Sequence, residues 1–129
     1  MAHVTVEWTD NLDGAFDLPD LMSLIAAEMR DRSDGAFPVG GIRVRAIRLT
    51  DYVIADGQEP DDAFINIDVK MGVGRDAAFK RVFFDQLFAA VTASLGDLFD
   101  RRPLALSLYV EEAAGWKHNT IHRRLAAGT

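Results

Sequence analysis

Three arginines, Arg43, Arg45 and Arg75, are the side chains of this sequence best suited to bind a small anion. The chain has 14 Lys and Arg against 20 Asp and Glu, a net charge of −6, so its average field repels anions. A carboxylate ligand would therefore need a local cluster of arginines. Arg43 and Arg45 are two residues apart in a predicted strand and share one face of it, whereas Arg48 points the other way. Strand arginines are often solvated edge residues, but two on one face of an acidic protein favour a binding role.

Arg75 stands at the start of a predicted helix. A cation is electrostatically unfavourable beside the positive end of a helix dipole, so an anion is expected to compensate it. Two compensating anions remain open: the side chain of Asp76, or a bound carboxylate held by the guanidinium and free helix N–H groups. The second alternative predicts an anion site at this turn.

Other patterns in the sequence carry weaker signals. Residues 71–77 follow a strand and open a helix, as a G-x-G-x-x-G/A dinucleotide turn does, but the acidic residue expected about 20 positions on falls in or at the end of the helix, near Asp97. We interpret this segment as a glycine turn. His118 and His122 are four apart, yet the H-E-x-x-H pattern is missing, so we expect surface or interface histidines and no metal. No serine has a glycine elbow, so no Ser-His-Asp set is predicted.

Hydrophobic periodicity predicts the elements that must position these arginines. Alternation with a period of two indicates strands over 3–8, 42–49, 63–71 and 104–110, and helical spacing indicates helices over 19–33 and 75–99. Asp17 is the expected cap of the first helix, and Pro19 suits its first turn.

The order strand, helix, strand occurs twice, in pseudo-repeats of about 3–58 and 62–122. This order predicts an α+β fold, a duplicated β-α-β unit in which four strands form one mixed sheet with two helices on one face. The opposite face then lacks cover, and we expect another copy of the subunit to bury its apolar residues. At 129 residues, the chain is expected to form a single domain, 1–129.

Composition narrows the functional classes. A hydrophobic content of 49% favours a folded domain, and the absence of cysteine excludes disulfides and thiolate metal ligands. The net charge of −6 argues against binding nucleic acid or an anionic membrane. No stretch approaches the roughly 18 apolar residues of a membrane span, and no secretory signal precedes the first strand. The expected location is the cytoplasm.

Several segments in order carry a family resemblance: 3–8 with the Thr9-Asp10-Asn11 turn, 17–19, 37–45, 55–58 and 72–75, continuing through 105–107 to His122. Over nearly its whole length the chain is similar to 5-carboxymethyl-2-hydroxymuconate isomerases. The resemblance implies the tautomerase fold of the macrophage migration inhibitory factor (MIF) superfamily, a homotrimer, and a cofactor-free 1,3-proton shift in the breakdown of aromatic compounds.

In that family an N-terminal proline amine carries the proton and arginines hold the substrate carboxylates. Arg43 and Arg75 match the arginine positions, and Trp116 matches an aromatic wall of the site. The sequence departs from the family at Ala2, which aligns with the proline. If Met1 is removed, Ala2 carries a primary amine that can act as a base or form a Schiff base; if Met1 stays, the amine is displaced by one residue.

We therefore expect a tautomerase that needs neither a cofactor nor a metal. Arg43, Arg45 and Arg75 would bind a small carboxylate or dicarboxylate, Trp116 would line the pocket, and the terminal amine at Ala2 or a water would relay the proton. The alternative is a tautomerase-fold trimer that binds carboxylates without rapid tautomerisation, because Ala2 replaces the proline.

Overall fold

The computed structural model describes residues 1–127. Its strands are β1 (Ala2–Thr9), β2 (Ile42–Leu49), β3 (Ala63–Met71) and β4 (Leu104–Glu112); its helices are α1 (Leu18–Asp31), α2 (Ala77–Ser94), α3 (Leu98–Arg101) and α4 (Ile121–Ala127); and two short 3₁₀ turns are η1 (Asp10–Leu12) and η2 (Val39–Gly41).

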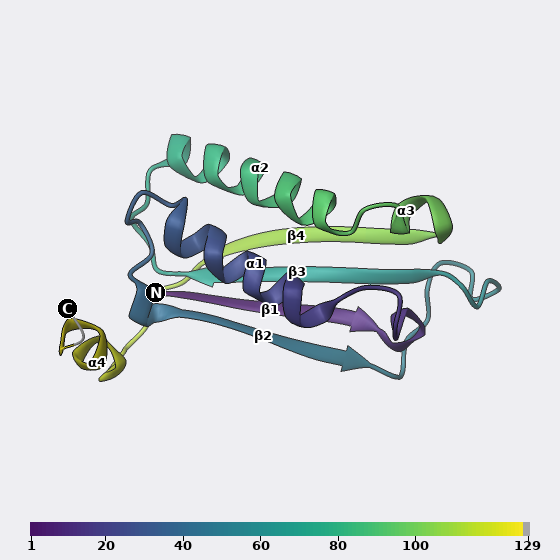
Figure 1. Cartoon of the computed structure of the whole chain (residues 1–129), viewed down its shortest axis with the longest axis horizontal. Helices are drawn as coiled ribbons and strands as arrows, with labels where there is room; N and C mark the ends of the chain where they lie inside the picture. The colour runs from purple at the N-terminus through teal and green to yellow at the C-terminus, as the bar shows by residue number, and fades with distance from the viewer. Residues whose placement is uncertain (128–129) are drawn as a thin grey trace.

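The four strands form one sheet in the order β2-β1-β3-β4. The pairs β1–β2 and β3–β4 are parallel, and β1 and β3 run antiparallel at the centre. Each parallel pair is joined through a helix, and α1 and α2 both lie over the same face of the sheet (Figure 1). The predicted four-stranded mixed sheet with two helices on one face is confirmed.

The core lies between the sheet and the two long helices. Alternate strand residues point toward the helices and are buried, and α1 and α2 meet them with apolar residues four positions apart. Burial of each large apolar side chain contributes about 1.5–3 kcal/mol. The largest contributors from these elements include Val4, Val6, Ile65, Ile67, Leu21, Ile25, Met29, Phe83 and Leu87.

The opposite face of the sheet, here called the open face, is mainly polar, and it carries a few exposed apolar side chains. The period-two alternation that fills the core leaves the intervening positions to polar side chains. Apolar exceptions are Ile47, Leu49, Phe64 and Tyr109, whereas His3, Thr5, Glu7, Arg43, Arg45, Asn66, Asp68, Lys70 and Glu111 carry polar groups. Ile47 and Tyr109 are exposed on this face, and their cover by another copy of the subunit stays a prediction.

The predicted helix over 75–99 is shorter and interrupted. It begins at Ala77, ends at Ser94, and is followed after a turn by the four-residue α3. Gly96 has φ of 58°, the left-handed conformation that ends helices and that glycine adopts without steric cost. Across residues 1–127, no helix is both long and apolar enough to span a membrane.

Helix α4 has no counterpart in the predicted elements, and it projects from the end of the sheet near the chain start (Figure 1). It is tied to η2 by Asn119, whose Nδ2 donates to the carbonyl oxygen of Gly40 at 2.7 Å and whose Oδ1 accepts from the N–H of Ile121 at 2.9 Å. A Cβ added at Gly40 would stand only 2.5 Å from Nδ1 of His122. The glycine therefore allows α4 to approach η2.

Gly40→Ala is expected to loosen α4 while leaving the body folded. The new methyl group would push His122 away, so trypsin should cleave faster after Arg123 and Arg124, as followed by mass spectrometry. The double variant Gly40→Ala/His122→Ala removes the clashing ring and should restore slow cleavage. Equal cleavage rates in Gly40→Ala and the unaltered protein would contradict this account.

Candidate active site at the chain start

The first strand brings the start of the chain to one end of the sheet. Ala2 lies between Ile42 of β2 and Met71 of β3, and its side chain is fully buried in the core. Met1 rests against Gly41, where an added Cβ would stand 3.2 Å from Met1 Cα. With Met1 present the terminal amine lies one residue before Ala2, and with Met1 removed it lies on Ala2, so both forms place an amine at this end of the sheet.

Arg75 lies in the loop between β3 and α2 and is fixed from three sides. Its Nη1 donates to the carbonyl oxygen of Gly72 at 2.9 Å, its Nη2 donates to that of Ala36 at 2.9 Å, and its guanidinium lies 4.7 Å from the ring centroid of Phe37. Within residues 1–127 Arg75 forms no salt bridge with Asp76 or with any other carboxylate. A guanidinium has five N–H donors, so this anchoring leaves Nη hydrogens for a ligand.

A second arginine turns toward the chain start. Arg43 of β2 is half-buried, and its Nη1 lies 3.4 Å from the carbonyl oxygen of Gly41, the residue against which Met1 packs. Arg43 is paired in register with His3 and therefore shares the open face with it. The strand periodicity thus positions Arg43 beside the terminus.

Lys117 completes a group of three cations around the amine. A Cβ at Gly72 would lie 3.4 Å from Nζ of Lys117 and 3.8 Å from Nη1 of Arg75, so both cations converge on this glycine. Burial lowers the pKa of the Met1 amine from its ordinary value of 8.0, and the charges of Lys117, Arg75 and Arg43 lower it further. The arrangement favours a neutral amine, which can accept a proton.

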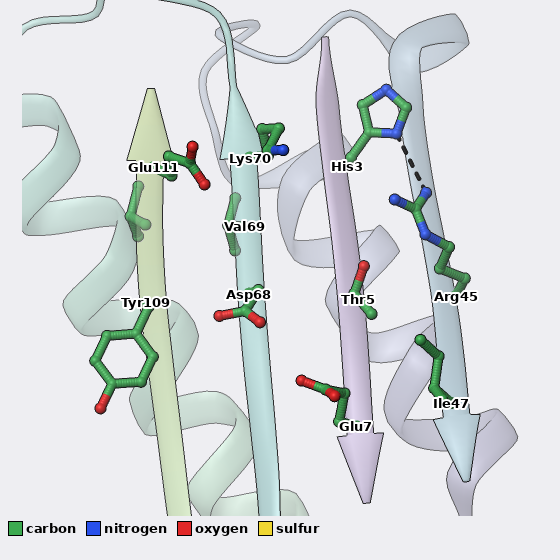
Figure 2. A pocket seen from close by; sticks show the side chains of 11 residues that line it. His3, Thr5, Glu7, Arg45, Ile47, Asp68, Val69, Lys70, Tyr109 and Glu111 are labelled. Carbon is green, nitrogen blue, oxygen red and sulfur yellow. Dashed lines mark hydrogen bonds between the residues drawn. The ribbon is translucent and has the colours of Figure 1, made fainter. Parts of the chain in front are cut away.

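Arg45 lies two residues beyond Arg43 in β2, and it contacts His3 rather than the terminal residue. Its Nη1 lies 3.2 Å from Nδ1 of His3, and the dashed line in Figure 2 marks this hydrogen bond. Because a guanidinium can only donate, Nδ1 is the acceptor and a neutral His3 carries its proton on Nε2. Burial lowers the pKa of His3, and the positive charges of Arg43, Arg45, the terminal amine and Lys70 lower it further. This end of the open face is strongly electropositive.

Two small cavities meet at Met1. One, of about 270 Å³, is lined by Met1, Pro38, Gly41, Lys117, Asn119 and His122. The other, of about 180 Å³, is lined by Met1, His3, Gly72 and residues of the segment 113–117, among others. Both have the terminal residue and Lys117 in their walls, so a ligand in either would lie beside the amine.

A larger hollow of about 710 Å³ runs along the open face (Figure 2), but its charge suits an anion less well. Besides His3 and Arg45, its lining includes the carboxylates of Glu7, Asp68 and Glu111. These carboxylates repel an anionic ligand over much of the hollow. The chain start, where three cations have no carboxylate within ion-pairing distance among residues 1–127, is the better carboxylate site.

The matched family model covers residues 2–125 and describes 5-carboxymethyl-2-hydroxymuconate isomerases.

The chain belongs to this isomerase family.

A 5-carboxymethyl-2-hydroxymuconate Delta-isomerase of Escherichia coli is 32% identical over 125 residues, which cover 95% of this chain and 97% of that protein. A crystal structure of a 5-carboxymethyl-2-hydroxymuconate isomerase from Deinococcus radiodurans R1 superposes with a TM-score of 0.89 at 40% identity, covering 96% of this chain and 93% of that one. A fused 4-OT symmetric trimer, a tautomerase-fold protein, shares the fold at 19% identity with a TM-score of 0.55, covering 87% of each chain. The predicted family and the predicted tautomerase fold are confirmed.

Membership of the isomerase family leaves the role of Trp116 as a prediction. Its side chain contributes to the smaller cavity, yet 99% of its surface is exposed. In the single subunit it therefore forms no enclosing wall. Arg45 likewise contacts His3 rather than the amine, whereas Arg43 and Arg75 both lie close enough to shift the pKa of the amine.

Lys117 is the residue of this candidate site that sequence reasoning did not select. It lies in the irregular segment between β4 and α4, where no periodicity fixes the direction of a side chain. The anchoring carbonyl of Ala36 and the ring of Phe37 were also missed. The position of Lys117 next to Trp116 was a hint that it belongs to the site. The segment is placed, however, by the hydrogen bond between Asn119 and Gly40, a tertiary contact that sequence periodicity does not predict.

Proposed function

We propose that the chain is a cofactor-free tautomerase of the 5-carboxymethyl-2-hydroxymuconate isomerase type, acting on a small carboxylate or dicarboxylate in the breakdown of aromatic compounds. The observation that carries the proposal is the terminal amine of Met1 among Arg43, Arg75 and Lys117, beside two small cavities. The E. coli and D. radiodurans relatives named as isomerases support the reaction class.

In the proposed mechanism the neutral amine removes a proton from a carbon next to the substrate carbonyl. The electron pair moves onto the carbonyl oxygen and forms a dienolate, whose negative charge is stabilised by the neighbouring cations. Arg75 and Arg43 hold the carboxylates, and the ammonium returns the proton to a carbon two positions along. The amine is then neutral again, so no cofactor or metal is consumed.

An ultraviolet assay of the 1,3-proton shift, which changes the conjugation of the substrate, tests this proposal together with intact-mass spectrometry of the same sample. We expect the reaction to be faster than in buffer. The intact mass should show a free amine on Met1 or, after removal of Met1, on Ala2. A rate no higher than in buffer would favour the second candidate, a trimer that binds carboxylates without rapid tautomerisation. The replacement of the family's proline by Ala2 favours that alternative.

The pH dependence of kcat/KM is expected to report the amine. Only the neutral amine can accept a proton, so kcat/KM should rise with pH through the amine pKa, which lies below its ordinary value of 8.0. Lys117→Gln removes one of the cations that lower this pKa, so the rise should move to higher pH. The position of the rise is the readout, because lost substrate contacts alter only its height.

Arg101→Gln makes the same change in net charge at the far end of the molecule, where Arg101 is exposed and paired with Asp97. This control should leave the position of the rise unchanged. A rise that stays in place in Lys117→Gln would mean that another group accepts the proton.

We also propose that the active form is a homotrimer in which a neighbouring subunit packs against Trp116. The almost complete exposure of this side chain supports the proposal, as does the fused 4-OT relative described as a symmetric trimer. Gel filtration with light scattering should give about three subunit masses. A stable, active monomer would overturn the trimer.

A further inference from the structure

The terminal amine of this chain is primary, which opens a reaction beyond proton transfer. The amine belongs to Met1, and removal of Met1 would transfer it to Ala2, which is also primary. A neutral primary amine adds to a carbonyl carbon and forms an imine. Amines that do so in enzymes are activated by desolvation or by a neighbouring cation, and both conditions hold here.

The surroundings of the amine select the kind of carbonyl compound. Arg75 has Nη hydrogens left after binding two backbone carbonyls, and Arg43 and Lys117 add positive charge. A carboxylate bound by these cations would hold an adjacent carbonyl group next to the amine. Small 2-oxo acids have a carboxylate directly attached to the carbonyl carbon. Cavities of about 180 and 270 Å³ suit molecules of this size.

We propose that the terminal amine condenses with small 2-oxo acids to form an imine and thereby exchanges their C3 protons with solvent. This inference rests on the proposed function only in using the same amine and cations. The nitrogen lone pair forms a bond to C2, the carbonyl oxygen takes up two protons, and it leaves as water. The protonated imine loses a C3 proton to water and becomes an enamine; reprotonation at C3 and hydrolysis release the 2-oxo acid and the free amine.

Lys117 is the competing amine, and the structure argues for a different role. Lys117 lines both cavities. Its ammonium group can donate a proton to the hydroxyl that leaves as water. Its side chain is exposed, whereas Met1 is half-buried against Gly41. We therefore assign the imine to the terminal amine and proton donation to Lys117.

The test uses pyruvate with cyanoborohydride, followed by intact-mass spectrometry and peptide mapping. The expected result is one N-(1-carboxyethyl) group on the N-terminal residue, whether Met1 or Ala2. Lys117→Gln should keep the label at the terminus, and Arg75→Gln should lower its yield about tenfold because the carboxylate loses a charge-assisted partner. Without reductant, pyruvate in deuterium oxide should gain deuterium at C3 faster than in buffer, as measured by proton NMR.

No label, or a label found only on lysine side chains, would overturn the imine. The ultraviolet tautomerase assay is run on the same protein and separates the two proposals. A labelled terminus in a protein that does not tautomerise would overturn the proposed function alone, whereas a fast tautomerase that gives no label would overturn this inference alone.

Discussion

Arg75→Ala is expected to lower kcat/KM for the carboxylate substrate by about 10²–10³-fold, the loss seen when a donor to a developing negative charge is removed. The guanidinium is held by the carbonyl oxygens of Gly72 and Ala36 at 2.9 Å and lies over Phe37, so its direction is set before a ligand arrives. No solvent or side-chain rearrangement is then needed to stabilise the dienolate.

Arg75→Lys separates charge from geometry. Lysine keeps the positive charge but lacks the planar fork, so we expect an intermediate loss in kcat/KM. Both variants also lose hydrogen bonds to two backbone carbonyls, and the free energy of unfolding should fall by about 1–3 kcal/mol, which denaturant titration measures. Arg48→Ala, which removes an exposed arginine of the same strand as Arg43, is the control and should keep its activity. An Arg75→Ala variant within twofold of the unaltered enzyme would place the anion site elsewhere.

Blocking the terminal amine is expected to reduce the tautomerase rate by about 10²–10⁴-fold, the range that a positioned general base contributes. Cyanate reacts with neutral amines, and at about pH 6 lysine side chains with ordinary pKa values are protonated, so the amine of lowered pKa reacts first. The carbamoyl group is small and uncharged. Activity should fall as the fraction of singly carbamylated protein, measured by mass spectrometry, rises.

Full activity in completely carbamylated protein would show that the base is another group, and His3 would be the next to test. A complementary variant is Ala2→Pro prepared without Met1. It restores the secondary amine to which the family resemblance points and is expected to raise the tautomerase rate. An unchanged rate in that variant would mean that the type of amine does not limit the reaction.

The sheet and the core were predictable because they depend on periodicity. Alternation in 63–71 and helical spacing in 19–33 reflect burial on one side, and the structure follows both. The break in the second helix was missed because Gly96 is one glycine in an otherwise helical pattern, and only its left-handed φ of 58° reveals the stop. The open face is mainly polar because strand alternation places most apolar residues on the helix side, and its cover by another copy stays a prediction.

The candidate site was predictable where it lies on or directly beside a regular element. Arg43 follows from strand alternation, and Arg75 from its position before a helix. Lys117 was not predictable, because the segment that carries it is placed by the contact between Asn119 and Gly40, some 79 residues away in sequence. The structure places Ala2 between β2 and β3, and the amine stays predicted on Ala2 after removal of Met1 or on Met1 itself.

The central position of β1 in the sheet has a consequence for how the protein folds as it is made. The ribosome produces this strand first, yet one of its two partners, β3, begins only at Ala63. A pairing of such long sequence separation has a high loop-closure cost and forms slowly. Until β3 emerges, the apolar residues of β1 have at most one neighbouring strand, so the nascent chain is most exposed to aggregation during synthesis of its first half.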